Sequence, residues 1–306
     1  MSFVRTVCGD VPASELGRCY GHEHLMGQPP PDCATPDLTL DSEHAALHAL
    51  SHFRTAGGDA LVEMTTRDYG RDPAGLRRLS ENSGVHVIAA TGFNKDKFSR
   101  RYVKDRTARE LADTFARDVT EGIGETDVRA GVLKAASTLD EISDAAQTVF
   151  RAVACAHRET GAPISTHTEA GTMALEQIDM LTADGVPPEH ITIGHLDRRL
   201  DWAYHRKIAE TGVFMGFDQI SKEKYASDRT RIDFILRLFE EGFGQQVLLS
   251  GDLARRSYWP AYGTGGGPGF TYILWRFVPW LRKEGLSEDA IRALLIDNPA
   301  RAFAFA

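Results

Sequence analysis

The sequence predicts an α/β fold, a (β/α)8 TIM barrel that forms a single domain over residues 1–306. Three observations indicate this fold. Eight short segments rich in β-branched or apolar residues recur along the chain, amphipathic segments lie between them, and no change of composition marks a linker. Short apolar strands are typical of a parallel sheet that is covered on both faces. Eight strand–helix units in one chain of this length favour the barrel, with a doubly wound sheet as the alternative.

Strands and helices are expected to alternate from the N-terminus onward. The predicted strands are residues 19–25, 59–65, 85–90, 130–134, 163–167, 191–195, 213–216 and 247–250. Apolar residues at helical spacing predict helices over residues 41–56, 108–121, 139–160, 174–183 and 230–241. Glycines lie where helices are expected to end, at Gly161, Gly185, Gly212 and Gly242.

The composition is that of an ordinary globular protein, with 42% hydrophobic and 25% charged residues. A formal net charge of −8 argues against a general nucleic-acid surface. No apolar run reaches the length of about 18 residues that suggests a membrane span, and the first residues lack the apolar stretch of a signal peptide. We therefore expect a cytoplasmic protein without a membrane partner. The four cysteines show no CxxC spacing and are expected to be reduced thiols.

The predicted first strand contains two histidines, His22 and His24, on either side of Glu23. Side chains alternate between the faces of a strand, so the two imidazoles point the same way and Glu23 points the other way. Two imidazoles in this arrangement can share a metal ion. Taken alone this is weak evidence, because neighbouring histidines occur by chance in many chains.

Further polar groups lie at the ends of other predicted strands, where a (β/α)8 barrel has its active site. They are Lys134, His167, His195 and Asp252. Each has a purely structural explanation: a lysine reaching solvent, hydrogen-bonded core histidines, or an aspartate that begins a turn. Imidazoles and charges that are buried at one point need partners, and a metal centre supplies them. Nitrogen and oxygen ligands suit Zn²⁺ and related ions, and two ions about 3.5–4 Å apart can share a hydroxide.

The order of these six residues resembles the phosphotriesterase-like family of the amidohydrolase superfamily. The local sequences around them are also similar to that family, at residues 21–25, 129–134, 166–168, 193–195 and 250–252, and residues 297–301 resemble its last helix. The resemblance covers nearly the whole chain. It implies two divalent metal ions, zinc first and manganese or cobalt as alternatives. His22, His24 and Asp252 would hold the more buried ion and His167 and His195 the more exposed one, while a carboxylated Lys134 and a hydroxide would bridge them.

The family contains organophosphate hydrolases, carboxylesterases, lactonases and sugar-phosphate lactonases, so the loops must indicate the substrate. Lys224, Arg255 and Tyr258 resemble the phosphate-binding set of the sugar-phosphate lactonases, and a guanidinium group suits phosphate. Residues 95–106 carry six basic and two acidic side chains, which form either a cationic rim or a solvated loop. Asn94 lies where simple acyl-lactonases of the family have a tyrosine, and this fits a more polar substrate.

The predicted function is therefore hydrolysis of a small, anionic, phosphorylated sugar lactone. The bridging hydroxide would attack the lactone carbonyl, and Asp252 would move the proton to the departing ring oxygen. A carboxylesterase, another lactonase or a phosphotriesterase with the same metal centre is the alternative, while a non-catalytic binding protein is disfavoured because all six centre residues are present. The apolar residues 270–281 are expected to pack on the barrel, and a contact with a second subunit in a homodimer stays open.

Overall fold

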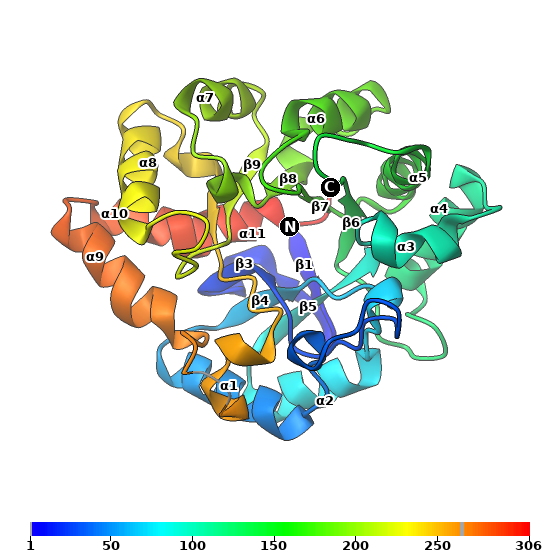
Figure 1. The fold of residues 1–306 in the computed structure, drawn as a ribbon, viewed down its shortest axis with the longest axis horizontal. Coiled ribbons are helices and arrows are strands. Elements are labelled where there is room, and N and C mark those ends of the chain that lie inside the picture. Colours follow the sequence, from blue (N-terminus) through cyan, green and yellow to red (C-terminus); the bar gives the residue numbers. More distant parts are fainter. Residues whose placement is uncertain (1, 264–265) are drawn as a thin grey trace.

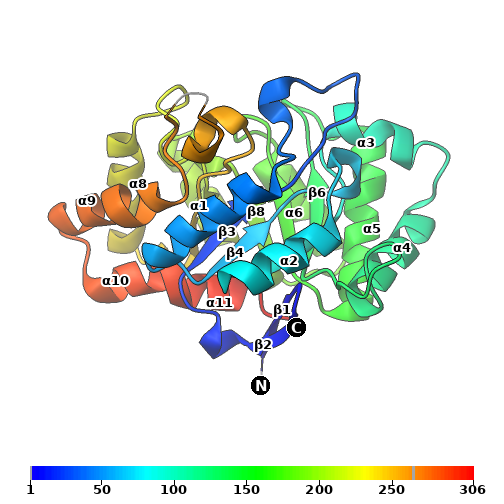
Figure 2. The same cartoon turned by 90° about the horizontal axis from the view of Figure 1, so that it is seen from below.

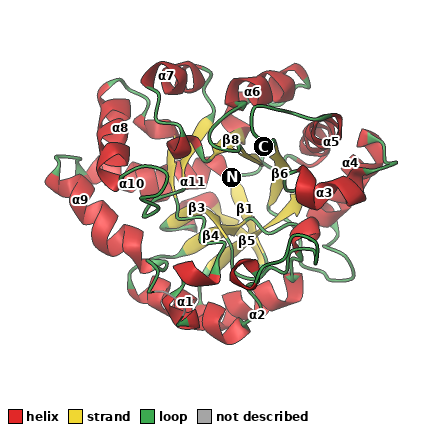
Figure 3. Ribbon diagram, in the orientation of Figure 1, coloured by secondary structure: helices red, strands yellow, loops and turns green. Residues whose placement is uncertain are grey.

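The structure is a computed structural model that describes residues 2–263 and 266–306. Its centre is a sheet of eight strands in the order β10-β9-β8-β7-β6-β5-β4-β3, and every neighbouring pair in this order is parallel. The helices surround the strands on the outside (Figures 1 and 3). The predicted (β/α)8 barrel is confirmed.

All eight predicted strands are present, with ends that differ by a few residues. They are β3 (Cys19–Glu23), β4 (Ala60–Glu63), β5 (His86–Gly92), β6 (Val132–Ala136), β7 (Ile164–His167), β8 (Ile191–Gly194), β9 (Phe214–Phe217) and β10 (Val247–Leu249). The predicted end of the fourth strand at Lys134 is wrong, because β6 continues for two further residues. Lys134 therefore lies at the middle of a barrel strand, among buried neighbours, and cannot reach solvent from there.

The helices are α1 (Glu43–Thr55), α2 (Pro73–Ser83), α3 (Asp96–Val103), α4 (Ala108–Thr120), α5 (Asp144–Thr160), α6 (Ala174–Ala183), α7 (Trp202–Glu210), α8 (Asp228–Glu240), α9 (Val278–Lys283), α10 (Glu288–Arg292) and α11 (Asn298–Ala302).

The predicted start of a helix at residue 139 is wrong. Helix α5 begins at Asp144 because Ser143 caps it, accepting a hydrogen bond from the main-chain N–H of Ala146. Gly161, with a φ of 72°, ends the same helix as expected.

An antiparallel hairpin of β1 (Phe3–Thr6) and β2 (Gly9–Pro12) precedes the barrel and was not predicted. Figure 2 shows it at the lower end of the barrel, beside the C-terminus. The main-chain N–H of Phe305 donates to the carbonyl of Phe3, and the two rings stack with centroids 4.8 Å apart. Val4 and Phe303 belong to the apolar cluster inside the barrel. The hairpin and the C-terminal segment therefore close this end, which leaves the opposite end for a site.

The first and last barrel strands, β3 and β10, are joined by side chains. The hydroxyl of Ser250 accepts from the main-chain N–H of His22 at 3.1 Å and donates to its carbonyl at 2.7 Å. The carboxylate of Glu23 accepts from the main-chain N–H groups of Gly251 at 2.7 Å and Leu253 at 2.9 Å. Glu23 is wholly buried, and its carboxylate supplies hydrogen bonds that connect β3 to the residues after β10.

The apolar segment 270–281 packs mainly on the barrel, as predicted. Phe270, Phe277 and Leu281 are buried in the main core. Trp275 differs, since 55% of its surface is exposed. Within residues 2–263 and 266–306, no helix combines the length and the apolar character that crossing a membrane requires.

Candidate metal centre

The four predicted histidines meet at the carboxyl ends of the barrel strands. His22 lies in β3 and His24 directly follows it, His167 is the last residue of β7, and His195 directly follows β8. The ring centroid of His195 lies 4.7 Å from that of His22 and 4.5 Å from that of His167, and the centroids of His22 and His24 are 5.7 Å apart. Burial lowers the pKa of all four imidazoles, and that of His195 to about 4. They are neutral at pH 7, the form that binds metal.

Asp252, which follows β10, completes one set of converging ligand atoms. Its Oδ1 lies 3.3 Å from Nε2 of His24 and 4.0 Å from Nε2 of His22. These three residues could hold one metal ion. The backbone is in the left-handed region at Asp252, with a φ of 44°, and at His195, with a φ of 63°. Such strained residues cluster at functional sites, where the surrounding structure maintains them.

The ring nitrogen of His24 that faces away from Asp252 has its own partner. Nδ1 of His24 lies 2.8 Å from the hydroxyl of Thr65, which donates to Oε1 of Glu63 at 2.5 Å. Burial raises the pKa of Glu63 to about 7. Imidazoles that bind metals usually have a hydrogen-bond partner of this kind on the other nitrogen, which fixes the orientation of the ring.

The same arrangement recurs at His195 and His167. Nδ1 of His195 lies 2.6 Å from Oδ1 of Asp218, which also accepts from the main-chain N–H of His195. Nε2 of His167 lies 3.4 Å from Oε2 of Glu169. His22, His195 and Asp218 also form a group that could hold a metal ion. Because Asp218 is already bonded to His195 through two atoms, it fits better as the residue that orients this imidazole.

Lys134 lies in the same region and is 1% exposed. Its Nζ donates to the carbonyl of Met64 at 2.7 Å. Among the residues that the structure describes, no carboxylate lies within 4.0 Å of Nζ. Burial lowers the pKa of Lys134 to about 8. Burial of an ammonium without a directly bonded carboxylate is costly, so the neutral amine is far more accessible near neutral pH than in an exposed lysine. The donor set of four imidazoles, one carboxylate and this amine fits a pair of divalent ions.

All six predicted centre residues line one cavity of about 220 Å³. Three larger cavities, of about 630, 430 and 390 Å³, lie elsewhere among the described residues and contain none of them. The other residues that line the small cavity are mostly polar or aromatic, and five are cationic: Lys95, Lys97, Arg198, Lys222 and Arg255. The cavity therefore combines a floor of candidate metal ligands with a positively charged wall.

The predicted substrate residues lie at or beside this wall. Asn94, Arg255 and Tyr258 line the cavity. Lys224 does not, but its Nζ donates to the hydroxyl of Tyr258 at 2.8 Å. Nη1 of Arg255 donates to Asp37 at 3.1 Å, and 40% of the Arg255 side chain is exposed. The guanidinium is thus held at the cavity mouth, with part of its surface free for a ligand.

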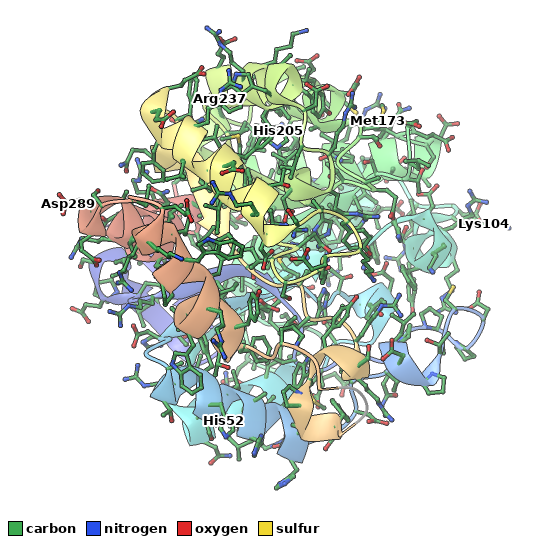
Figure 4. The ribbon with its side chains drawn as sticks, turned by 60° about the vertical axis from the view of Figure 1, so that its left-hand side comes forward. His52, Lys104, Met173, His205, Arg237 and Asp289 are labelled. Carbon is green, nitrogen blue, oxygen red and sulfur yellow. The ribbon has the colours of Figure 1, made fainter. Side chains whose placement is uncertain are left out.

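The basic segment 95–106 is divided between the cavity and solvent. Lys95 and Lys97 line the cavity, and Lys95 also forms an ion pair with Glu169. Lys104 points outward at the edge of the molecule (Figure 4). Both interpretations of this segment therefore apply, the cationic rim to its first residues and the solvated surface to its last.

The comparison with known proteins agrees with this geometry. The profile of the Phosphotriesterase family matches residues 2–303. The chain belongs to the phosphotriesterase family. It is therefore a hydrolase.

Relatives of the chain extend over almost its whole length. A phospho-furanose lactonase from Mycoplasmopsis synoviae (strain 53) is 32% identical over 324 residues, which cover 99% of this chain and 92% of that protein. The crystal structure of a lactonase from Listeria monocytogenes has a TM-score of 0.96 and 37% identity, and the match covers 100% of both chains. The phosphotriesterase homology protein from Escherichia coli, complexed with phosphate in its active site, has a TM-score of 0.91 at 33% identity, covering 96% of this chain and 99% of that one.

Several residues of this phosphotriesterase-family site were not predicted from the sequence. Arg198 is a charged residue within a few positions of the end of β8, and this position was the available signal. Lys222 lies in the basic segment 222–225 that suggested an anionic substrate, but its contact with Asp252 was not predicted. Tyr69 gave no such signal. It ends a short 3₁₀ turn after β4, is 5% exposed, and its ring centroid lies 6.1 Å from that of His24. An aromatic ring from the turn after β4 therefore borders the candidate metal centre, where the sequence suggested none.

Proposed function

We propose that the protein is a metal-dependent lactonase that opens a phosphorylated sugar lactone. The observation that carries this proposal is the position of Arg255 and Tyr258, which line the same small cavity as the four histidines, Lys134 and Asp252. The lactonase from Listeria monocytogenes and the phospho-furanose lactonase from Mycoplasmopsis synoviae support the reaction class. A carboxylesterase, another lactonase or a phosphotriesterase with the same centre remains the alternative.

Six residues would hold the metal ions. His22, His24 and Asp252 would bind one divalent ion and His167 and His195 a second, with Lys134, carboxylated by CO₂, between them. Zinc is the first choice for this donor set, and manganese or cobalt are the alternatives. When bound, two such ions supply an activated water and polarise a carbonyl oxygen.

Asp252 is the proton carrier in this proposal. Burial raises its pKa, but the Lys222 ammonium and the adjacent imidazoles outweigh burial, and the pKa lies well below the usual value. Asp252 is therefore an ionised base at neutral pH. It takes a proton from the attacking water and delivers it to the departing ring oxygen of the lactone.

Lys224, Arg255 and Tyr258 would anchor the phosphate group at the cavity mouth. Guanidinium and ammonium groups form strong charge-assisted hydrogen bonds with phosphate oxygens. The phosphate in the active site of the Escherichia coli relative supports an anion at this end of the barrel. Binding energy gained there would hold the lactone carbonyl at the metal centre and fix its orientation. Asn94 would contact the sugar part of the substrate.

A panel of matched substrates tests this proposal. The protein, reconstituted with zinc or manganese, is assayed with γ-lactones of pentoses and hexoses, each with and without a phosphate group, and with simple carboxylic esters and a phosphotriester. We expect kcat/KM to be at least ~100-fold higher for the phosphorylated lactones, about 2.7 kcal/mol. Equal values for the dephosphorylated lactones would refute the phosphate assignment. Activity confined to esters or phosphotriesters would favour the alternative.

A further inference from the structure

We propose that Lys222 is a positioning residue that holds Asp252 so that only one carboxylate oxygen faces a metal ion. Lys224, two residues later, instead contacts Tyr258 at the cavity mouth. This inference rests on the metal centre of the proposed function. The two lysines belong to one segment, 222–224, that follows β9. Their ammonium groups bind different partners, Asp252 for Lys222 and Tyr258 for Lys224.

The ammonium of Lys222 makes three hydrogen bonds, and two of them are to Asp252. Nζ donates to Oδ2 of Asp252 at 2.9 Å and to its main-chain carbonyl at 2.7 Å. The third bond goes to Oε1 of Gln219 at 2.9 Å. The Lys222 side chain is 5% exposed. All three ammonium protons are therefore used within the protein, mainly on one residue.

These bonds divide the two oxygens of the Asp252 carboxylate between different partners. Oδ2 accepts from Lys222 and from Nε2 of Gln219 at 2.8 Å. Oδ1 faces Nε2 of His24 at 3.3 Å and Nε2 of His22 at 4.0 Å. Only Oδ1 is thus directed toward the imidazoles that would share a metal ion with Asp252.

Lys222 also stabilises an unfavourable backbone conformation at Asp252. A φ of 44° places this residue in the left-handed region, which is unfavourable for a residue with a Cβ atom. The main-chain N–H of Asp252 donates to the carbonyl of His22 at 3.1 Å, and Lys222 binds the carbonyl on the other side. Both main-chain polar groups of Asp252 are therefore fixed.

The segment that carries Lys222 is itself held firmly. The carbonyl of Lys222 accepts from Nη2 of Arg231 at 3.4 Å. Arg231 is wholly buried and forms ion pairs with Asp197 at 2.7 Å and Asp228 at 2.9 Å. A buried, fully paired arginine thus fixes the backbone from which Lys222 reaches Asp252.

Lys224 provides a matched comparison within the same loop. Its Nζ donates to the hydroxyl of Tyr258, and no hydrogen bond to Asp252 is present among the described residues. Nζ of Lys222 lies 5.0 Å from the centroid of the Tyr258 ring, and Nζ of Lys224 lies 5.5 Å from the same centroid. The same chemical change at either position removes one ammonium group beside Tyr258, but only one of the two changes releases Asp252.

The loss of the Lys222 charge and the loss of its orienting contacts would change metal affinity in opposite directions. A measurement of metal affinity can therefore test the proposal. Removal of a positive charge beside a metal-binding carboxylate strengthens binding of a dication by Coulomb attraction alone. Loss of a group that orients a ligand weakens binding, typically by 10- to 100-fold. The direction of the change in metal affinity therefore separates a positioning role from that of a nearby charge.

The test is a zinc titration of the metal-free, full-length protein in the presence of a competing chelator. We expect Lys222→Met to weaken binding of the first equivalent at least ~10-fold and Lys222→Arg, which keeps the donors, to recover part of the loss. Lys224→Met should leave zinc affinity within about twofold of the wild type.

With lactone substrate, Lys222→Met should lower kcat more than it changes KM. Circular dichroism and thermal melts establish that each variant is folded, and Lys222→Gln replaces Lys222→Met if the latter does not fold.

Each result has a defined meaning. Zinc affinity in Lys222→Met that equals or exceeds that of the wild type overturns the positioning role. Equal losses in Lys222→Met and Lys224→Met overturn the division between the two lysines. A wild-type protein that binds no zinc overturns the proposed metal centre together with this inference. A wild-type protein that binds zinc but hydrolyses no lactone overturns the proposed substrate only, and the affinities still decide the role of Lys222.

Discussion

The carboxylate of Glu23 accepts a 2.7 Å hydrogen bond from the main-chain N–H of Gly251, and this contact joins the first and last strands of the barrel. Burial raises the pKa of Glu23 to about 7. The residue lies between His22 and His24, and Gly251 immediately precedes Asp252. This bond therefore joins the two segments that carry the candidate metal ligands His22, His24 and Asp252.

Replacement of Glu23 by alanine is expected to destabilise the fold. The change leaves the buried N–H groups of Gly251 and Leu253 without their acceptor, at about 1–3 kcal/mol each. Glu23→Gln, which keeps one oxygen, should lose less. Urea denaturation of the metal-free variants measures the effect, and an alanine variant as stable as the wild type would show that this junction is held by other contacts.

Asp218→Asn should weaken binding of the second metal ion. An amide can donate to Nδ1 of His195, which places the imidazole proton on the nitrogen that must bind metal. We expect at least ~10-fold weaker binding of the second equivalent, measured by metal analysis after gel filtration against defined free zinc. Asp179→Asn, on the exposed side of α6, is the matched control. Two equivalents bound at wild-type affinity in Asp218→Asn would contradict the orienting role.

Metal uptake should depend on CO₂ and on pH through Lys134. The amine reacts with CO₂ only when neutral, and burial lowers its pKa to about 8. At constant dissolved CO₂, the rate of reconstitution should rise with pH through about 8, where half of the amine is neutral, and level off about two pH units higher, where the neutral fraction approaches one. The measurement is recovery of activity after zinc addition in CO₂-free buffer with and without added bicarbonate. Full recovery without CO₂ would exclude carboxylation.

Arg255→Ala should raise KM for a phosphorylated lactone about 10- to 100-fold, because a charge-assisted hydrogen bond contributes about 1.5–3 kcal/mol. The effect on kcat should be small if the group only anchors the phosphate. Arg256→Ala is the control, since Arg256 pairs with Asp41 and does not line the cavity. Steady-state kinetics with both variants decide the role, and equal KM values for Arg255→Ala and the wild type would exclude phosphate anchoring by this residue.

The strands and the convergence of the centre were predictable because strand periodicity and barrel topology bring strand ends together regardless of loop detail. His22, His24, His167 and His195 are within one residue of a strand, so their direction follows from the fold. Lys222 lies in a loop, and no pattern in the sequence shows that its side chain turns inward to Asp252.

Other features escaped prediction because they depend on contacts between distant segments. The β1–β2 hairpin is stabilised beside Phe305, at the opposite end of the chain. Tyr69 reaches the centre through a short turn that has no apolar periodicity. The start of α5 depended on the cap at Ser143, which outweighed the apolar spacing further upstream.

The junction between β3 and β10 has a consequence for the order of events during synthesis. His22 and His24 leave the ribosome early, whereas Asp252 and its partner Lys222 are made only when most of the chain exists. A growing chain therefore has the imidazoles of the first ion but not its carboxylate. In the proposed metal centre, the full ligand set of the first ion therefore forms only in the finished polypeptide, and the metal would stabilise the closed barrel and not a nascent fragment that lacks the last strand.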